Sequence, residues 1–186
     1  ALAVNGEIYN HRELASELDY DFTTGSDCEV INALYREHGT GFVPQLNGIF
    51  AFALWDGEAG RYLIARDPIG VCPLYWGHDE QGRLCVASEM KALVGLCADV
   101  TAFPPGHLYD SVAGKLQPYY AKPWREYAAT RGHAVSAPAL REAFEQAVHR
   151  QLMTDVPYGV LLSGGLDSSL VAACAAQFAR ERVEDN

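Results

Sequence analysis

Hydroxyl, glycine and carboxylate residues gather in one short stretch near the end of this 186-residue chain. It reads Ser-Gly-Gly-Leu-Asp-Ser-Ser over residues 163–169 and follows an apolar run of strand length at 158–162. A glycine pair lets the backbone approach a ligand, and a helix starting there would direct unpaired N–H groups at it. The pattern favours a phosphate site over a plain serine-rich turn, although the Gly-Lys-Ser/Thr of the Walker A motif is missing.

Helices that could position such residues are predicted from capping signals and apolar spacing. Asn10 and Glu13 have the spacing of a capping box, as do Ser26 and Glu29. Gly39 is well placed to end the second of these helices. We therefore expect two amphipathic helices before residue 40.

Extended segments follow, and their pattern predicts antiparallel hairpins. The nearly continuous apolar run at 49–55 indicates a strand covered on both faces, and it returns through 62–65. A second hairpin is expected between 74–76 and 84–87, with two further extended pieces up to about residue 120.

Mixed composition marks a linker, and the helical period returns after it. We place a domain at 1–120, a linker at 121–138 and the start of a second domain at 139–186. The second domain opens with apolar residues at every fourth position, namely Leu140, Phe144, Val148 and Leu152.

Charge and composition narrow the partners. The formal net charge is -10 and there is no Lys/Arg-rich run, which disfavours a nucleic-acid partner. The five cysteines lack metal-ligand spacing, so no protein-held metal is expected. Without a membrane-length apolar run, no membrane partner is expected, and the composition indicates a cytoplasmic protein.

Five motifs in order resemble glutamine-hydrolysing asparagine synthetases of the bacterial B type over the whole chain. In chain order they are Asn5-Gly6-Glu7-Ile8-Tyr9-Asn10, Thr24-Gly25-Ser26-Asp27-Cys28-Glu29, Arg66-Asp67-Pro68-Ile69-Gly70 with Pro73-Leu74-Tyr75, Ala87-Ser88-Glu89-Met90-Lys91-Ala92-Leu93, and the stretch at 163–169. The resemblance implies an α+β fold. It would comprise the C-terminal part of an N-terminal-nucleophile (αββα sandwich) glutaminase domain of the class II amidotransferases, then the start of an α/β ATP-pyrophosphatase domain.

The same resemblance implies the reaction and its partners. Glutamine would yield ammonia, while aspartate and ATP form β-aspartyl-AMP and pyrophosphate, with Mg²⁺ on the phosphates. Ammonia would then displace AMP to give asparagine. Members of the family commonly dimerise, so a homodimer is expected.

Individual residues take roles from the resemblance. Asn5, through its side-chain amide, and Gly6, through its N–H, would form the oxyanion hole of the glutaminase. Glu7 and Asp27 would hold the α-ammonium of glutamine. The ATP-binding residues would be Leu162 near the adenosine and, around the pyrophosphate, Ser163, Gly164, Gly165, Asp167 and Ser168. Taken alone, Asn5-Gly6 would indicate a tight turn, and Asp27 a first-turn acid of a helix.

One departure from the family concerns the nucleophile. The family uses a cysteine at its mature N-terminus, whereas position 1 is Ala. We therefore expect an internal piece of a longer protein, inactive in both half-reactions by itself. Two alternatives stay open: a β-lactam-synthetase-like adenylating enzyme, and a non-catalytic glutaminase-like scaffold.

Overall fold

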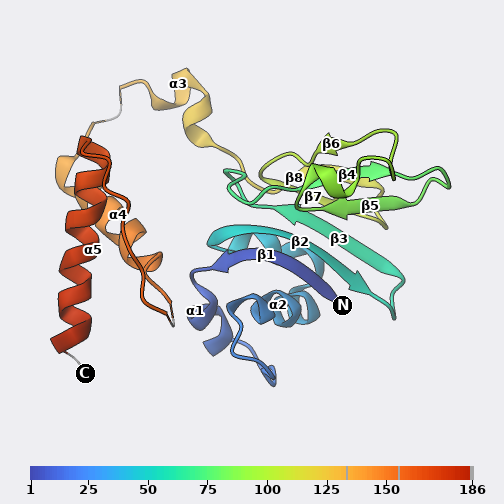
Figure 1. Cartoon of the computed structure of the whole chain (residues 1–186), viewed down its shortest axis with the longest axis horizontal. Helices are drawn as coiled ribbons and strands as arrows, with labels where there is room; N and C mark the ends of the chain where they lie inside the picture. Colours follow the sequence, from blue (N-terminus) through green and yellow to red (C-terminus); the bar gives the residue numbers. More distant parts are fainter. Residues whose placement is uncertain (133, 155, 185–186) are drawn as a thin grey trace. The chain divides into compact units, whose positions relative to one another are not determined.

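The structure is a computed structural model that describes residues 1–132, 134–154 and 156–184. The chain divides into two units, Ala1–Arg125 and Glu126–Asn186. Figure 1 shows the elements of both units in chain order.

The first unit is built on a five-stranded antiparallel sheet with the order β1-β2-β3-β7-β8. Its strands are β1 (Leu2–Ile8), β2 (Gly48–Asp56), β3 (Arg61–Arg66), β7 (His107–Asp110) and β8 (Lys115–Pro118). The predicted hairpin is confirmed, because Trp55 of β2 lies opposite Tyr62 of β3. The two extended pieces expected before residue 120 are β7 and β8.

A second, three-stranded sheet has the order β5-β4-β6. It contains β4 (Tyr75–His78), β5 (Leu84–Ala87) and β6 (Thr101–Ala102), and the register of Trp76 against Val86 confirms the second predicted hairpin. A 3-10 turn, η3 (Met90–Ala92), lies between β5 and β6.

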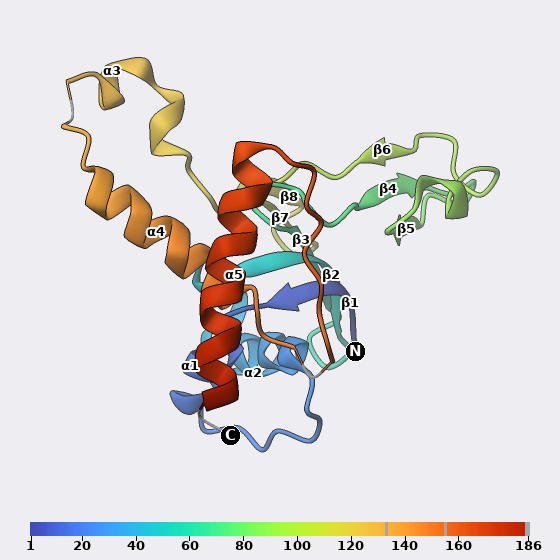
Figure 2. The same cartoon turned by 60° about the vertical axis from the view of Figure 1, so that its left-hand side comes forward.

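Helices cover the face of the five-stranded sheet that lies away from the three-stranded sheet (Figures 1 and 2). They are α1 (His11–Ser16), η1 (Asp27–Glu29), α2 (Val30–His38) and η2 (Gly39–Gln45). Alternate residues of β2 face the two layers: Phe50 and Phe52 pack with the helices, while Ala51 packs with Leu74 and Phe103. The prediction that this strand is covered on both faces is confirmed.

The capping predictions succeed only in part. Gly39 ends α2 with a φ of 60°, as expected. Asn10 does not cap α1 with its side chain, which instead contacts Gln45 O and Asn47 N at 2.9 Å each. Ser26 does cap η1, but Glu29 bonds elsewhere and completes no capping box. The Asn10 side chain thus bonds to a distant segment, and the Glu29 side chain to the loop that precedes η1.

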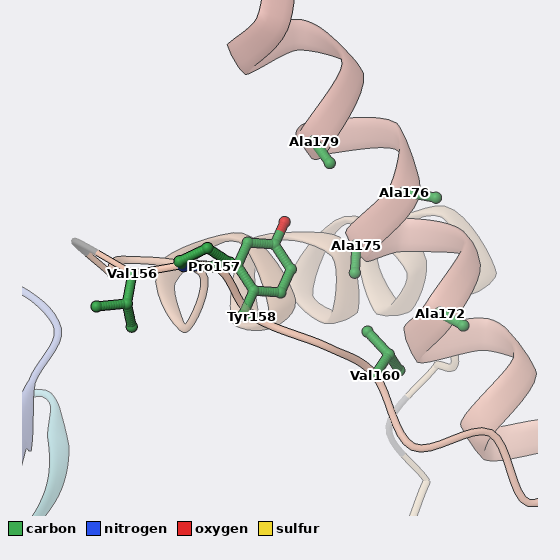
Figure 3. A pocket seen from close by; sticks show the side chains of 8 residues that line it. All are labelled: Val156, Pro157, Tyr158, Val160, Ala172, Ala175, Ala176 and Ala179. Carbon is green, nitrogen blue, oxygen red and sulfur yellow. The ribbon is translucent and has the colours of Figure 1, made fainter.

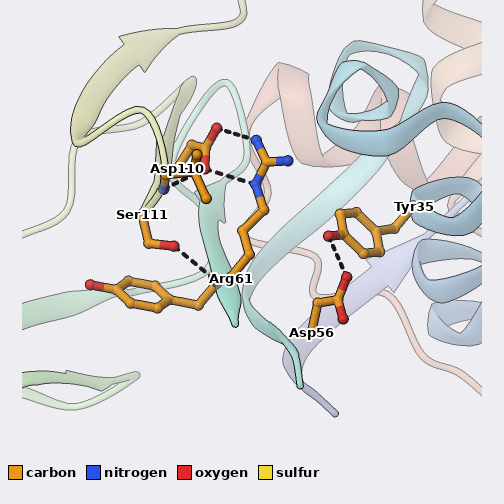
Figure 4. Close-up of polar contacts among 7 residues, drawn as sticks. Tyr35, Asp56, Arg61, Asp110 and Ser111 are labelled. Carbon is orange, nitrogen blue, oxygen red and sulfur yellow. Dashed lines mark hydrogen bonds and ion pairs between the residues drawn. The ribbon is translucent and has the colours of Figure 1, made fainter. Parts of the chain in front are cut away.

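Polar contacts tie the β2–β3 hairpin to its neighbours (Figure 4). Arg61 donates to both carboxylate oxygens of Asp110, with Nε at 2.9 Å from Oδ1. Tyr35 donates to Asp56 at 2.9 Å. These bonds connect β3 to β7 and α2 to the hairpin turn.

The second unit is helical in its described residues. It holds α3 (Tyr127–Thr130), α4 (Ala137–Arg150) and α5 (Leu166–Glu184); η4 (Pro123–Arg125) ends the first unit. Most of the predicted four-residue ladder lies on α4, but Leu152 follows its end. No helix in the described ranges is long and apolar enough to cross a membrane.

The strand predicted at 158–162 does not form. The segment carries no strand assignment, and a strand needs neighbours to pair its backbone, which the described part of this unit does not supply. The segment instead packs on α5, where Tyr158 and Val160 lie toward Ala172 and Ala175 beside a cavity of about 550 Å³ (Figure 3).

Candidate functional site

Strand β1 has an open edge on the side away from β2. Within the described residues it pairs only with β2. The bonds from Trp55 N to Ala1 O (2.7 Å) and from Tyr9 N to Asn47 O (2.8 Å) show that odd-numbered residues of this segment bond across to β2. Because bonding alternates along an antiparallel pair, the backbone groups of Gly6 and Ile8 point to the open edge.

Side chains occupy three of the four edge groups of Gly6 and Ile8. Ile8 N–H donates to Asp27 Oδ2 at 2.6 Å, Ile8 O lies 3.0 Å from His11 Nδ1, and Gly6 O accepts from the Cys28 thiol at 3.7 Å. The Gly6 N–H has no partner in the part of the chain that the structure describes. The Gly6 N–H is therefore available at this edge to donate a hydrogen bond to a ligand.

Gly6 is required by the close approach of β2. Its φ is 139°, and a Cβ there would lie 2.0 Å from Ile49 O. It lies inside β1 rather than in a turn, so the tight-turn interpretation of Asn5-Gly6 is wrong.

The side chains of Asn5 and Glu7 lie on one face of β1 beside this donor. They are opposite Ala51 and Ile49 and share their face of the sheet, away from the helices. Both residues are exposed, whereas Asp27 is half-buried in the first turn of η1. Asp27 therefore has the first-turn position suggested by the sequence and also reaches β1.

Burial and a nearby carboxylate keep the thiol of Cys28 protonated. Burial, followed by the charge of Asp27, raises the pKa of the Cys28 thiol to about 12. Burial and the nearby Glu7 carboxylate likewise raise the pKa of Tyr9. Cys28 is thus a hydrogen-bond donor at neutral pH and not a thiolate nucleophile.

The sequence does not indicate that Cys28 and His11 bond to the backbone of β1. A single cysteine without ligand spacing, such as Cys28, gives no signal in the sequence of a contact with a distant strand. The contact of His11 with Ile8 O is local, and only the position of β1 at a sheet edge gives it meaning.

The second predicted site forms a turn before α5. Gly164 has a φ of 83°, and the hydroxyls of Ser163 and Ser168 lie 3.0 Å apart across the turn. The bond from Ser169 N to Gly165 O (3.1 Å) opens the helix, so the N–H groups just before Ser169 have no intrahelical acceptor. The turn brings together the hydroxyl and glycine residues predicted there; Leu162 is exposed beside them.

Comparison with known sequence families gives two matches. The glutamine amidotransferase domain family matches residues 1–119, and the asparagine synthase family matches residues 139–184.

Curated relatives cover the whole chain. Asparagine synthetase B [glutamine-hydrolyzing] of Escherichia coli (strain K12) is 53% identical over 186 residues, 99% of this chain and 34% of that enzyme. The asparagine synthetase [glutamine-hydrolyzing] of Zea mays is 51% identical over 185 residues, 99% of this chain and 31% of that enzyme. The chain therefore spans about a third of the length of these relatives.

A solved structure agrees with the fold. The glutamine phosphoribosylpyrophosphate amidotransferase from B. subtilis matches with a TM-score of 0.56 and 27% identity, over 66% of this chain and 29% of that one. The predicted α+β fold of an N-terminal-nucleophile amidotransferase is thereby confirmed.

Proposed function

We infer the function from one premise: this chain belongs to the glutamine amidotransferase domain family. We propose that the first unit binds glutamine and helps to release ammonia from its side-chain amide. The second unit would begin the domain in which ammonia, aspartate and ATP yield asparagine, AMP and pyrophosphate. The activity would belong to a longer protein, since relatives of this chain are about three times its length.

The observation that carries the proposal is the open N–H of Gly6. Attack on an amide carbon places negative charge on the amide oxygen, and fixed donors stabilise that charge. The pairing of β1 with β2 fixes the direction of the Gly6 N–H, and the Cys28 thiol also donates to the carbonyl oxygen of Gly6. The exposed Asn5 amide, next along β1, would supply the second donor of the oxyanion hole.

Carboxylates beside this donor suit the α-ammonium group of glutamine. Glu7 and Asp27 flank the open edge, and Asp27 uses Oδ2 for the Ile8 N–H. Its other oxygen would remain for the ligand. A small amino acid with a cationic end and a terminal amide matches this arrangement.

The turn before α5 fits a pyrophosphate group. Gly164 and Gly165 are followed by the first N–H groups of the 19-residue helix α5, which have no acceptor within that helix. Ser163, Asp167 and Ser168 would complete the ATP site, with Leu162 near the adenosine. ATP would supply the adenylyl group that activates aspartate, and Mg²⁺ would neutralise charge on the phosphates.

The test uses a chain extended at both ends to the length of the E. coli relative. It is supplied with ATP, Mg²⁺, aspartate and glutamine labelled with ¹⁵N at the amide. We expect ¹⁵N-asparagine, glutamate, AMP and pyrophosphate. Adenylation without labelled asparagine would indicate another adenylating enzyme, and absence of any glutamine turnover would indicate a scaffold; either result would refute the proposal.

A further inference from the structure

We propose that Glu29 is a positioning residue for glutamine: its carboxylate holds the loop that sets Asp27 against β1. This inference rests on the proposed glutaminase function. Glu29 lies two residues beyond Asp27 and is assigned no direct contact with the substrate. Its effect would pass through the loop at 23–26.

The Glu29 carboxylate accepts four hydrogen bonds from two adjacent threonines. Oε1 accepts from Thr23 N (2.8 Å) and Thr23 Oγ1 (3.0 Å), and Oε2 accepts from Thr24 N (2.7 Å) and Thr24 Oγ1 (2.5 Å). Glu29 is only 8% exposed, and it forms no ion pair with any residue in the described ranges. The four hydrogen bonds from the loop stabilise this buried charge.

Two further hydrogen bonds connect the loop held by Glu29 to the residues on either side of Asp27. Thr24 Oγ1 accepts from Ser26 N at 3.2 Å, and Ser26 Oγ accepts from Cys28 N at 3.3 Å. These bonds shape the turn on both sides of Asp27. Asp27 then meets Ile8 N–H, and Cys28 meets Gly6 O.

The four hydrogen bonds from Thr23 and Thr24 require that the Glu29 carboxylate is ionised. Hydrogen bonds, that of the Thr23 N–H first, lower the pKa of Glu29 to about 2. An ionised carboxylate offers only acceptors, which matches four donors. A glutamine side chain would present an NH₂ group to two of them, so Glu29→Gln should release part of the loop.

The experiment measures steady-state kinetics in the extended protein, with either glutamine or free ammonia as the nitrogen source. For Glu29→Gln we expect the KM for glutamine to rise about tenfold or more, while the ammonia-dependent rate stays unchanged. Glu37→Gln is the matched control, because its exposed carboxylate lies on the following helix. It should leave both activities unchanged.

Two substitutions at Thr24 separate positioning from folding. Thr24→Ser keeps the hydroxyl and should retain a KM near that of the parent, whereas Thr24→Val removes it at similar volume and should raise the KM. An unchanged KM in Glu29→Gln and Thr24→Val, or equal loss of ammonia-dependent activity, would overturn the role of Glu29. Failure of the parent protein to hydrolyse glutamine would instead refute the proposed function.

Discussion

Asp27 accepts the backbone N–H of Ile8 at 2.6 Å although 19 positions separate them in sequence. The carboxylate thereby takes a position that a neighbouring strand would otherwise fill on the open edge of β1. With Cys28 on Gly6 O, two consecutive residues of η1 hold two alternate residues of one strand. The edge is closed where η1 contacts it and open at the Gly6 N–H.

Replacing Gly6 by Ala should destabilise the first unit. A Cβ at φ 139° would lie 2.0 Å from Ile49 O, so strand pairing must shift. We expect the free energy of unfolding to fall by more than about 2 kcal/mol. Urea titration followed by tryptophan fluorescence reports on this unit, because all three tryptophans lie in it.

Gly41→Ala is the control for that substitution. A Cβ at Gly41 would meet nothing within 4 Å, and no positive φ is recorded there. Its effect should stay within about 0.5 kcal/mol. Equal effects of the two substitutions would show that Gly6 is not constrained by β2.

The sequence was informative about β2 and β3, whose apolar patterns indicate two extended segments close together in the chain. The apolar run of β2 and its return through residues 62–65 predicted a hairpin that the structure contains. Asn10 shows the limit of local rules: its spacing to Glu13 is that of a capping box, yet its side chain binds the segment before β2. The backbone of Gln45 and Asn47 binds the Asn10 side-chain amide in place of the helix N-terminus.

Stability should depend on pH through Glu29. Its pKa is lowered in the folded chain from 4.5 to about 2, so its ionised form favours folding. That contribution is fully present above pH 4.5 and is lost as pH falls toward about 2. The gap in urea midpoint between the parent and Glu29→Gln should therefore narrow from pH 5 to about pH 3. A gap that stays constant over this range would contradict the ionised state of Glu29 in the folded chain.

The Arg61–Asp110 ion pair should contribute more to stability than the neighbouring hydrogen bond from Tyr35 to Asp56. Asp110 is 4% exposed and its partner Arg61 is partly exposed, so Asp110→Asn should cost about 2 kcal/mol. Tyr35→Phe removes one hydrogen bond to Asp56 and should cost about 1 kcal/mol. Denaturation of both variants checks this order, and a larger loss for Tyr35→Phe would reverse the interpretation.

At the turn before α5, Gly164→Ala isolates the effect of backbone strain on the proposed ATP site. Gly164 has a φ of 83° with open space around it, so an added Cβ strains the turn without a clash. A strain of 1–2 kcal/mol corresponds to a rise of about tenfold in the Kd for ATP in the extended protein. Gly159→Ala adds a Cβ in open space at an ordinary φ and should leave the Kd unchanged. Calorimetry that finds the same Kd for both variants would exclude a role for this turn geometry.

The same region shows what a local pattern cannot supply. The residues at 158–162 are apolar enough for a buried strand, but a strand exists only when neighbours pair with it. The turn and helix that follow depend on Gly164 and on local hydroxyl contacts, so they form as the sequence predicts. The turn built from adjacent residues was therefore predictable, whereas the contact of Cys28 with the edge of β1 was not.

The most direct test of the oxyanion hole is the rate of glutamine hydrolysis by the extended protein with Asn5 replaced by Ala. Asn5 is exposed on β1, so the fold should tolerate the change. We expect a kcat lower by about 10²–10³-fold with a KM changed by less than a few fold, because the donor acts on charge that develops in the transition state. A kcat equal to that of the parent would contradict the assignment of Asn5 and Gly6 as the oxyanion hole.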